Sequence, residues 1–222
     1  MKNIAIIDYG IGNLYSVLKA CEFVGIKAEI TDDKNKIISA DAIILPGVGA
    51  FNDAMNSLNR LDLVNPIVDF SNSGKPLMGV CLGMQLLLSE SEELGSTKGL
   101  GIFEGICKKF PQINGDLKLK VPQINWNSIY PSNNRNNFKL NTPLEHIKSG
   151  EQMYFVHSYY ADLINEDEVL SKTTYGGIEY CSSINKKNIF GFQFHPEKSA
   201  KEGLSIYKKF NDIININDKN EK

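Results

Sequence analysis

The stretch GVCLG, centred on Cys81, has the form G-x-C-x-G at the end of an apolar segment. This is the cysteine counterpart of the G-x-S-x-G nucleophile elbow, in which flanking glycines allow the strained turn that exposes a nucleophile. Such a turn would place the sulfur at the start of a helix, where the dipole favours the thiolate, and would aim the Leu82 amide at an oxyanion. A buried cysteine at a tight strand–helix junction has the same pattern, so the motif alone leaves both interpretations open.

A cysteine nucleophile needs a base, and the chain has three histidines. His146 lies in a polar context that predicts a surface position, and His157 lies in a strand-like segment, where a lone histidine is typically structural. His195 ends an apolar segment, and Glu197 follows two residues later. Because residues i and i+2 of an extended chain face the same side, we expect Glu197 to orient the His195 imidazole for proton exchange with Cys81. An exposed histidine and glutamate in a strand-end turn are the alternative.

The stretch LPGVGAF is a third candidate, also at the end of an apolar segment. Gly47 and Gly49 would let the backbone approach a ligand and present amide groups around Val48, forming the second half of an oxyanion hole. An ordinary strand-to-helix turn fits the same residues. Because ligand sites gather at the strand ends of an open α/β sheet, we expect this turn to lie near Cys81 and His195.

The elements that would position these residues alternate between strand and helix in the first half of the chain. Apolar strand-like segments are separated by windows with the helical spacing of apolar residues, such as Leu14, Val17, Leu18 and Cys21. This alternation predicts a doubly wound α/β fold with a mostly parallel central sheet flanked by helices. The expected strands are NIAIIDYG, KAEITD, ADAIILPG and KPLMGV, and the expected later helices span about 50–59, 61–72 and 82–90.

The second half is richer in strands, which we expect to add antiparallel strands around the parallel core. The segments concerned are GIFEGICKKF, LKVPQINW, QMYFVHSYYA, EVLSKTTY, IEYCSSI and NIFGFQF. A final helix is expected at about 200–214, where apolar residues share one face. We expect one domain over residues 1–215, followed by a polar C-terminal tail at 216–222.

Composition narrows the class of function. The chain has 222 residues, 42% of them hydrophobic, and a net charge of −2, which gives no electrostatic case for nucleic acid or an anionic membrane as partner. No segment has the length of a membrane span or the pattern of a signal peptide. The four cysteines lie far apart with no C-x-x-C pair, which favours free thiols and a cytoplasmic location.

Three motifs, in this order along the chain, resemble those of the class I glutamine amidotransferases: the LPGVGAF turn, Cys81 in GVCLG, and the His-Pro-Glu segment. The resemblance covers nearly the whole chain. Within that family, the chain is most similar to the HisH type, the glutaminase subunit of imidazole glycerol phosphate synthase, which makes imidazole glycerol phosphate and AICAR in histidine biosynthesis. Met84 after the cysteine fits this type better than the related amidotransferases with histidine there. The segments that carry the resemblance are IDYGIGNLYSVLKA, PGVGAF, GVCLGMQLL, GLGIFEG, KVPQINWN, FVHSYY and FQFHPEKS.

The resemblance implies a glutaminase with a catalytic triad of Cys81, His195 and Glu197. Cys81 would attack the carboxamide of L-glutamine, and a thioester would then be hydrolysed. No metal and no organic cofactor is implied. The remaining assignments are oxyanion amides at Gly47, Val48, Gly49 and Leu82, and substrate contacts at Gln85, Ser158 and Tyr159.

The resemblance also implies a protein partner. Members of this type pass ammonia through a protected channel into a (β/α)8 synthase subunit of the HisF type, with which they form a heterodimer, and isolated glutaminase subunits are nearly silent. The peptide of Val48 is the expected switch, because its amide would have to turn toward the site. The positions that match the partner interface are Trp126, Tyr154, Lys198 and Asn125.

One segment departs from the family pattern, which has His-x-Gly-Trp-Asn where this chain has QINWN from Gln123. The departure fits either sequence drift or a HisH-like paralog that supplies ammonia to a sugar-amidating enzyme of surface-polysaccharide synthesis. A free-standing cysteine hydrolase and a non-catalytic binding subunit are further alternatives. The His-Pro-Glu segment and the DYGIGN start disfavour the hydrolase, and the intact Cys81, His195 and Glu197 disfavour the non-catalytic subunit.

Overall fold

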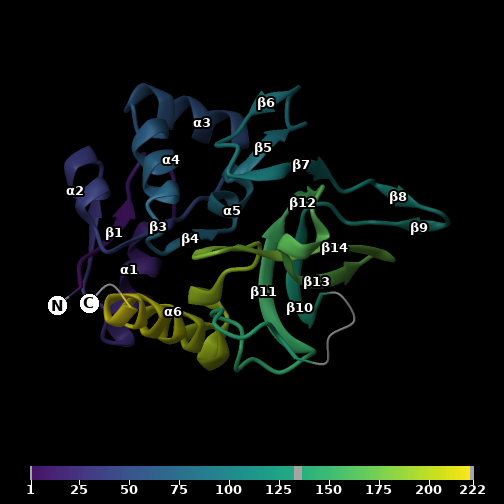
Figure 1. The fold of residues 1–222 in the computed structure, drawn as a ribbon. Helices are drawn as coiled ribbons and strands as arrows, with labels where there is room; N and C mark the ends of the chain where they lie inside the picture. The colour runs from purple at the N-terminus through teal and green to yellow at the C-terminus, as the bar shows by residue number, and fades with distance from the viewer. Residues whose placement is uncertain (1, 133–136, 221–222) are drawn as a thin grey trace.

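The computed structural model describes residues 2–132 and 137–220. Five parallel strands in the order β2-β1-β3-β4-β15 form the centre of the molecule (Figure 1). Every residue of the four inner strands is buried, because helices cover both faces of the sheet, and such strands therefore read as continuous apolar runs. The bounds are β1 (Ile4–Ile7), β2 (Ala28–Thr31), β3 (Ala42–Leu45), β4 (Leu77–Val80) and β15 (Ile189–Phe192).

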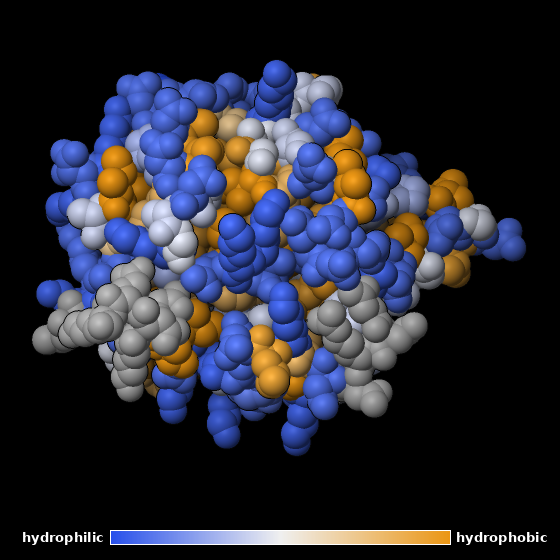
Figure 2. Space-filling model, in the orientation of Figure 1, coloured by the Kyte–Doolittle hydropathy of each residue, from blue (hydrophilic) through white to orange (hydrophobic). Residues whose placement is uncertain are grey.

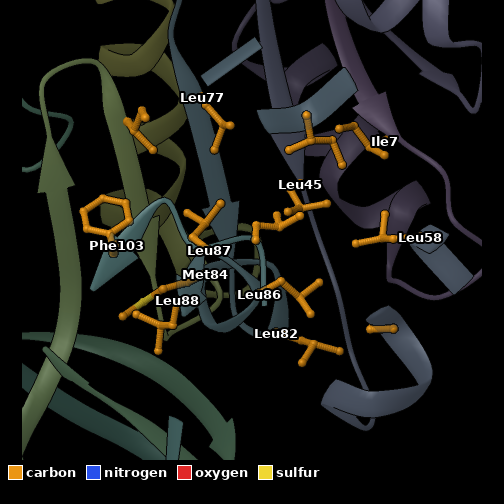
Figure 3. Close-up of a cluster of buried hydrophobic side chains, with 14 of the residues drawn as sticks. Ile7, Leu45, Leu58, Leu77, Leu82, Met84, Leu86, Leu87, Leu88 and Phe103 are labelled. Carbon is orange, nitrogen blue, oxygen red and sulfur yellow. The ribbon is translucent and has the colours of Figure 1, made fainter. Parts of the chain in front are cut away.

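Two helical layers bury the two faces of this sheet. One apolar cluster joins Leu45 to residues of α2, α3, α4 and α5, and Figure 3 shows part of it, with Leu45, Leu58 and Leu82 labelled. A second cluster joins the other face, including Phe192, to α1 and α6. The chain is therefore a three-layer α/β fold. The helices are α1 (Leu14–Phe23), α2 (Lys34–Ser39), α3 (Phe51–Arg60), α4 (Val64–Asn72), α5 (Leu82–Leu86) and α6 (Ala200–Asn220).

The second half adds antiparallel strands, as expected. Strand β14 pairs with β15, β12 and β13, and within the described residues the whole sheet has 13 strands. Burial alternates along β7 and β11, which fits strands with one covered face. The bounds are β5 (Leu88–Ser91), β6 (Thr97–Lys98), β7 (Phe103–Lys109), β10 (Gln123–Pro131), β11 (Glu151–His157), β12 (Tyr159–Leu163), β13 (Val169–Tyr175) and β14 (Ile178–Lys186), with a separate hairpin of β8 (Ile113–Asn114) and β9 (Leu117–Lys118).

The β8–β9 hairpin projects from the body of the molecule (Figure 1), and apolar atoms are visible at this edge of the surface (Figure 2). Ile113 and Leu117 are the exposed apolar residues of the hairpin. No helix in the described part of the chain has the length and hydropathy of a membrane span. All four cysteines are buried and free.

The helix predicted over 82–90 was wrong in its second half. Helix α5 ends at Leu86, and Leu88 begins strand β5, where it is in register with Phe103 of β7. The leucine run is buried throughout, so local pattern alone does not separate helix from strand. Pairing with a segment later in the chain decides the outcome.

Other helix bounds also differ from expectation. Helix α2 was missed because it is short and buries only Ile37, although Asp33 caps it through the amides of residues 35 and 36. Helix α4 begins at Val64 rather than at residue 61. Helix α6 continues past residue 214 to Asn220, so most of the predicted tail is helical, while 221–222 lie outside the described residues.

Candidate active site

Cys81 lies at the junction of β4 and α5 with a φ angle of 53°, in the left-handed region that non-glycine residues rarely adopt. Its amide donates a hydrogen bond of 2.7 Å to the carbonyl oxygen of Phe192, which fixes the strained residue to the neighbouring strand. The side chain is almost fully buried. A strained backbone held in this way is typical of a nucleophile at a strand–helix turn.

The flanking glycines are required by close contacts between backbones. A Cβ atom on Gly79 would lie 2.9 Å from the carbonyl oxygen of Gly83. A Cβ atom on Gly83 would lie 1.8 Å from the carbonyl oxygen of Leu45. Side chains at both glycine positions of G-x-C-x-G would therefore collide with backbone atoms. Gly79 packs against Gly83 within the elbow, and Gly83 packs against Leu45 at the end of β3.

His195 and Glu197 form the predicted pair, with 2.8 Å between Nδ1 and Oε1. Both side chains are buried, with 2% and 1% of their surface exposed. The expected extended backbone was wrong, because Pro196–Lys198 forms a 3-10 turn, η2. This turn brings the Glu197 carboxylate to the His195 ring. The contact is the predicted one, but a 3-10 turn produces it and not an extended strand.

The second ring nitrogen of His195 is unpaired next to the cavity that Cys81 also lines. Nε2 is buried and forms no hydrogen bond with the described part of the chain. Burial lowers the pKa of His195, but the Cys81 sulfur and the Glu197 carboxylate outweigh this effect and raise it to about 10. The sulfur therefore interacts with the imidazole without meeting hydrogen-bond geometry, as is common before a substrate binds.

A cavity of about 280 Å³ joins the candidate residues. It lies at the carboxyl end of β4, where ligand sites of α/β sheets form. The lining includes all three kinds of group that the sequence predicted: nucleophile, base and oxyanion turn. The residues around it are Val48, Gly49, Cys81, Leu82, Gln85, Glu93, Pro122, Val156, His157, Ser158, Tyr159 and His195.

Backbone amides around the cavity are free to bind an oxyanion. Those of Val48, Gly49 and Leu82 donate no hydrogen bond within the described part of the chain. Gly49 has a φ angle of 99°, which a side chain would strain, whereas Gly47 is buried behind the turn and does not line the cavity. Unpaired amides from the 47–49 turn and from the start of α5 thus border the cavity that Cys81 lines.

The Gln85 side chain supports the cavity from below. Its Nε2 donates to the carbonyl of Tyr159 and to Oε1 of Gln193, both at 2.9 Å. Gln193 in turn lies with Nε2 3.8 Å from the Cys81 sulfur. The family resemblance implied that Gln85 contacts the substrate, but its amide nitrogen already forms hydrogen bonds to Tyr159 and Gln193, which line or border the cavity. The position of Gln193 was not predicted from the sequence.

His157 is a structural part of the same wall. Burial lowers its pKa to about 4, so the ring is neutral near pH 7. Its two nitrogens lie 2.8 Å from the carbonyl oxygen of Tyr159 and 3.3 Å from the hydroxyl of Tyr180. Tyr180 also donates to Oε1 of Gln123 at 3.1 Å. Gln123 is fully buried, so the first residue of the QINWN segment belongs to this wall and not to the surface.

Glu93 was missed by sequence reasoning. It lines the cavity, and its Oε2 accepts a 2.6 Å hydrogen bond from the amide of Phe51 at the start of α3. In the sequence it is one acid among several after a segment expected to be helical. Glu93 follows β5, in the turn to β6, and the chain reaches the cavity there because residues 88–91 form a strand and not the expected helix.

A strip of three side chains from β10, β11 and η2 lies next to His195: Trp126 and Lys198 are exposed, and Tyr154 is half-buried. Trp126 and Tyr154 are cross-strand partners with ring centroids 6.1 Å apart, and Nζ of Lys198 lies 6.0 Å from the Tyr154 ring. The carbonyl of Tyr154 accepts the amide of His195 at 2.9 Å. Three of the four predicted interface residues therefore lie together, whereas Asn125, adjacent to Trp126 in a strand, faces the other side of the ribbon.

Acidic, cysteine and histidine side chains do not form a metal-binding cluster anywhere in the described ranges. The chemical groups at the cavity are a thiol, an imidazole paired with a carboxylate, and backbone amides. This combination is suited to acyl transfer from an amide or ester to water.

Comparison with known proteins agrees with this geometry. Residues 5–213 match the family model described as glutamine amidotransferase class-I, and the chain belongs to this family. The similar curated proteins are named imidazole glycerol phosphate synthase subunit HisH. That of Moorella thermoacetica is 44% identical over 96% of both chains, and that of Caldanaerobacter subterraneus is 46% identical over 95% of this chain and 98% of its own.

Solved structures support the fold at lower identity. A crystal structure described as a glutamine amidotransferase has a TM-score of 0.71 and 16% identity, covering 95% of this chain and 98% of its own. PurLQS from Thermotoga maritima has a TM-score of 0.70 and 20% identity, covering 96% and 99%. The predicted fold class is thus confirmed.

Proposed function

We propose that this chain is the glutaminase subunit of an imidazole glycerol phosphate synthase. It hydrolyses glutamine and delivers the ammonia to a (β/α)8 synthase subunit in a heterodimer, in histidine biosynthesis. The observation that carries the proposal is one cavity lined by Cys81 in a left-handed elbow, by His195 with its bond to Glu197, and by unpaired amides.

In the first step the Cys81 sulfur forms a bond to the carboxamide carbon of glutamine. The amide of Leu82 and those of the Val48–Gly49 turn stabilise the negative oxygen. The carbon–nitrogen bond then breaks as Nε2 of His195 gives its proton to the departing amide nitrogen, which leaves as ammonia. The product of this step is a glutamyl thioester and a neutral imidazole.

In the second step water hydrolyses the thioester. His195 takes a proton from the water while the oxygen attacks the carbonyl carbon, and the same amides stabilise the oxyanion again. The carbon–sulfur bond breaks, which releases glutamate and restores the thiolate beside a protonated His195. Glu197 keeps the ring oriented through both steps.

Substrate recognition is assigned to the outer part of the cavity. Among the described lining residues Glu93 is the one carboxylate, so we assign it the α-ammonium group of glutamine. Ser158 and Tyr159 form the neighbouring wall. A glutamine held at both ends would place its carboxamide at Cys81.

The curated relatives support the histidine pathway over a sugar-amidating partner. Those of Geobacter sulfurreducens and Moorella thermoacetica, at 43% and 44% identity over 96% of this chain, both carry the HisH name. The QINWN departure is partly internal, because Gln123 is buried against Tyr180. We assign the protein to the cytoplasm, an assignment supported by its four free thiols.

The test is a Cys81→Ala variant in complex with the synthase subunit. Glutamine-dependent synthesis should fall by about 1,000-fold or more, whereas synthesis from ammonium salts should persist, because the acceptor site is on the other chain. Cys181→Ala, which removes another buried thiol from β14, is the matched control and should retain both activities.

A histidine auxotroph that lacks its glutaminase subunit identifies the pathway when the wild-type chain and the Cys81→Ala variant are compared in it. The wild-type chain should restore growth at low ammonium, and Cys81→Ala should not. Loss of both synthetic activities in Cys81→Ala would contradict the glutaminase role. An active glutaminase that fails to restore growth would instead favour the paralog that serves a sugar-amidating enzyme.

A further inference from the structure

We propose that Tyr9 is a positioning residue for the oxyanion turn: its hydroxyl fixes the Pro46 end of the turn so that the Val48 and Gly49 amides reach the oxyanion. The inference rests on the proposed function and deepens it. Tyr9 does not line the cavity, so its action would be exerted only through the turn.

Tyr9 is held rigidly behind the site. It follows β1, is fully buried, and donates a 2.7 Å hydrogen bond from its hydroxyl to the carbonyl oxygen of Pro46. Its own carbonyl accepts the hydroxyl of Ser57 from α3. Burial, with Cys81 nearby, raises the pKa of Tyr9 well above its usual value, so the hydroxyl remains a donor over the range of an enzyme assay.

The hydroxyl also occupies the space beside the turn. A Cβ atom on Gly47 would lie 2.3 Å from it, 3.0 Å from the Cβ of Leu82 and 3.1 Å from the amide nitrogen of Gly83. Tyr9 thus lies against the same residue, Gly47, that packs on the nucleophile elbow. A shift of the ring would be transmitted to both halves of the oxyanion hole.

The other end of the turn has a second anchor. The Phe51 amide donates to Glu93, so residues between Pro46 and Phe51 are fixed at both sides. Between these two anchors Gly49 has free space next to it: a Cβ atom added there would meet only a methyl group of Ile11, at 4.0 Å. The turn can therefore rearrange at Val48–Gly49 but not at Pro46–Gly47, provided that the Tyr9 bond is intact.

A Tyr9→Phe variant removes this bond and keeps the ring. In the complex with the synthase subunit we expect kcat for glutamine hydrolysis to fall about tenfold, less than the 100-fold or more that follows deletion of an oxyanion donor. The KM for glutamine should stay within about twofold, because the contacts to the bound ground state remain, and ammonium-dependent synthesis should be unchanged. The matched control is Tyr175→Phe, which removes a 2.7 Å hydroxyl-to-carbonyl bond to Lys120 elsewhere and should not alter kcat.

A double variant tests the mechanism directly. Gly47→Ala should lower kcat because its new methyl group meets the Tyr9 hydroxyl, and adding Tyr9→Phe removes that contact, so the combined loss should be smaller than the product of the single losses. Independent, multiplicative losses, or a Tyr9→Phe variant with wild-type kcat, would overturn the inference. If Cys81→Ala still supported glutamine-dependent synthesis, the proposed function itself would fail, which is a different outcome.

Discussion

At the scale of single residues, the proposed mechanism depends on His195, whose proton affinity is set by two neighbours. Burial favours the neutral ring, whereas Cys81 and Glu197 favour the charged ring and raise the pKa to about 10. The protonated form that delivers a proton to ammonia is therefore present at neutral pH and is lost as the pH rises through that value.

Glu197→Gln should move the alkaline limb of the pH profile to lower pH. Without the carboxylate, only the Cys81 sulfur counteracts the lowering of the His195 pKa by burial. The pKa therefore falls, and the protonated ring is lost at a lower pH. The measurement is kcat/KM for glutamine against pH in the complex, with Glu202→Gln of α6 as control. An alkaline limb at the wild-type position would exclude a role for Glu197 in holding the proton.

Sequence reasoning selected Cys81, His195 and Glu197, which the structure brings together, because they sit in short motifs. It did not reach Glu93 or Gln193, since their roles depend on neighbours that are distant in the chain: Gln193 contacts Gln85 across 108 positions. Even the correct pair of His195 and Glu197 was derived from an extended backbone that is in fact a 3-10 turn. Residue types were therefore easier to predict than the local geometry that joins them.

Packing between elements explains why the elbow has so little tolerance. Helix α5 lies against the end of β3 closely enough that Gly83 has no room for a side chain. The buried parallel strands were predictable because both of their faces are apolar. The end of α5 was not, because the pairing of Leu88 with Phe103 depends on a strand that comes later in the sequence.

Gly83→Ala should be strongly destabilising, because a methyl group 1.8 Å from the Leu45 carbonyl oxygen forces the two backbones apart. The cost should be at least about 3 kcal/mol, at the upper end of overpacking effects. Gly95→Ala is the control: unlike Gly83, Gly95 has a positive φ angle, but a Cβ there meets nothing within 4 Å, so only backbone strain of about 1 kcal/mol is expected. Equal midpoints of urea unfolding for the two variants would contradict the steric argument.

At the scale of the whole molecule, the strip formed by Trp126, Tyr154 and Lys198 is the expected docking surface for the synthase subunit. Aromatic and cationic side chains are enriched at the centres of interfaces. Trp126→Ala should weaken the complex about 30-fold, measured as Kd by calorimetry, without changing kcat at saturating partner. Phe23→Ala on α1, an exposed aromatic residue outside the strip, should leave Kd unchanged; an equal loss in both variants would argue against this surface.

The hydrogen bond from the His195 amide to the Tyr154 carbonyl joins the general base to that strip. A partner that favours one arrangement of Tyr154 therefore also favours one arrangement of the base, and linkage makes the effect reciprocal. If the synthase subunit strengthens the binding of glutamine by some factor, glutamine must tighten the heterodimer by the same factor. The occupancy of one active site would then determine how long two proteins remain together.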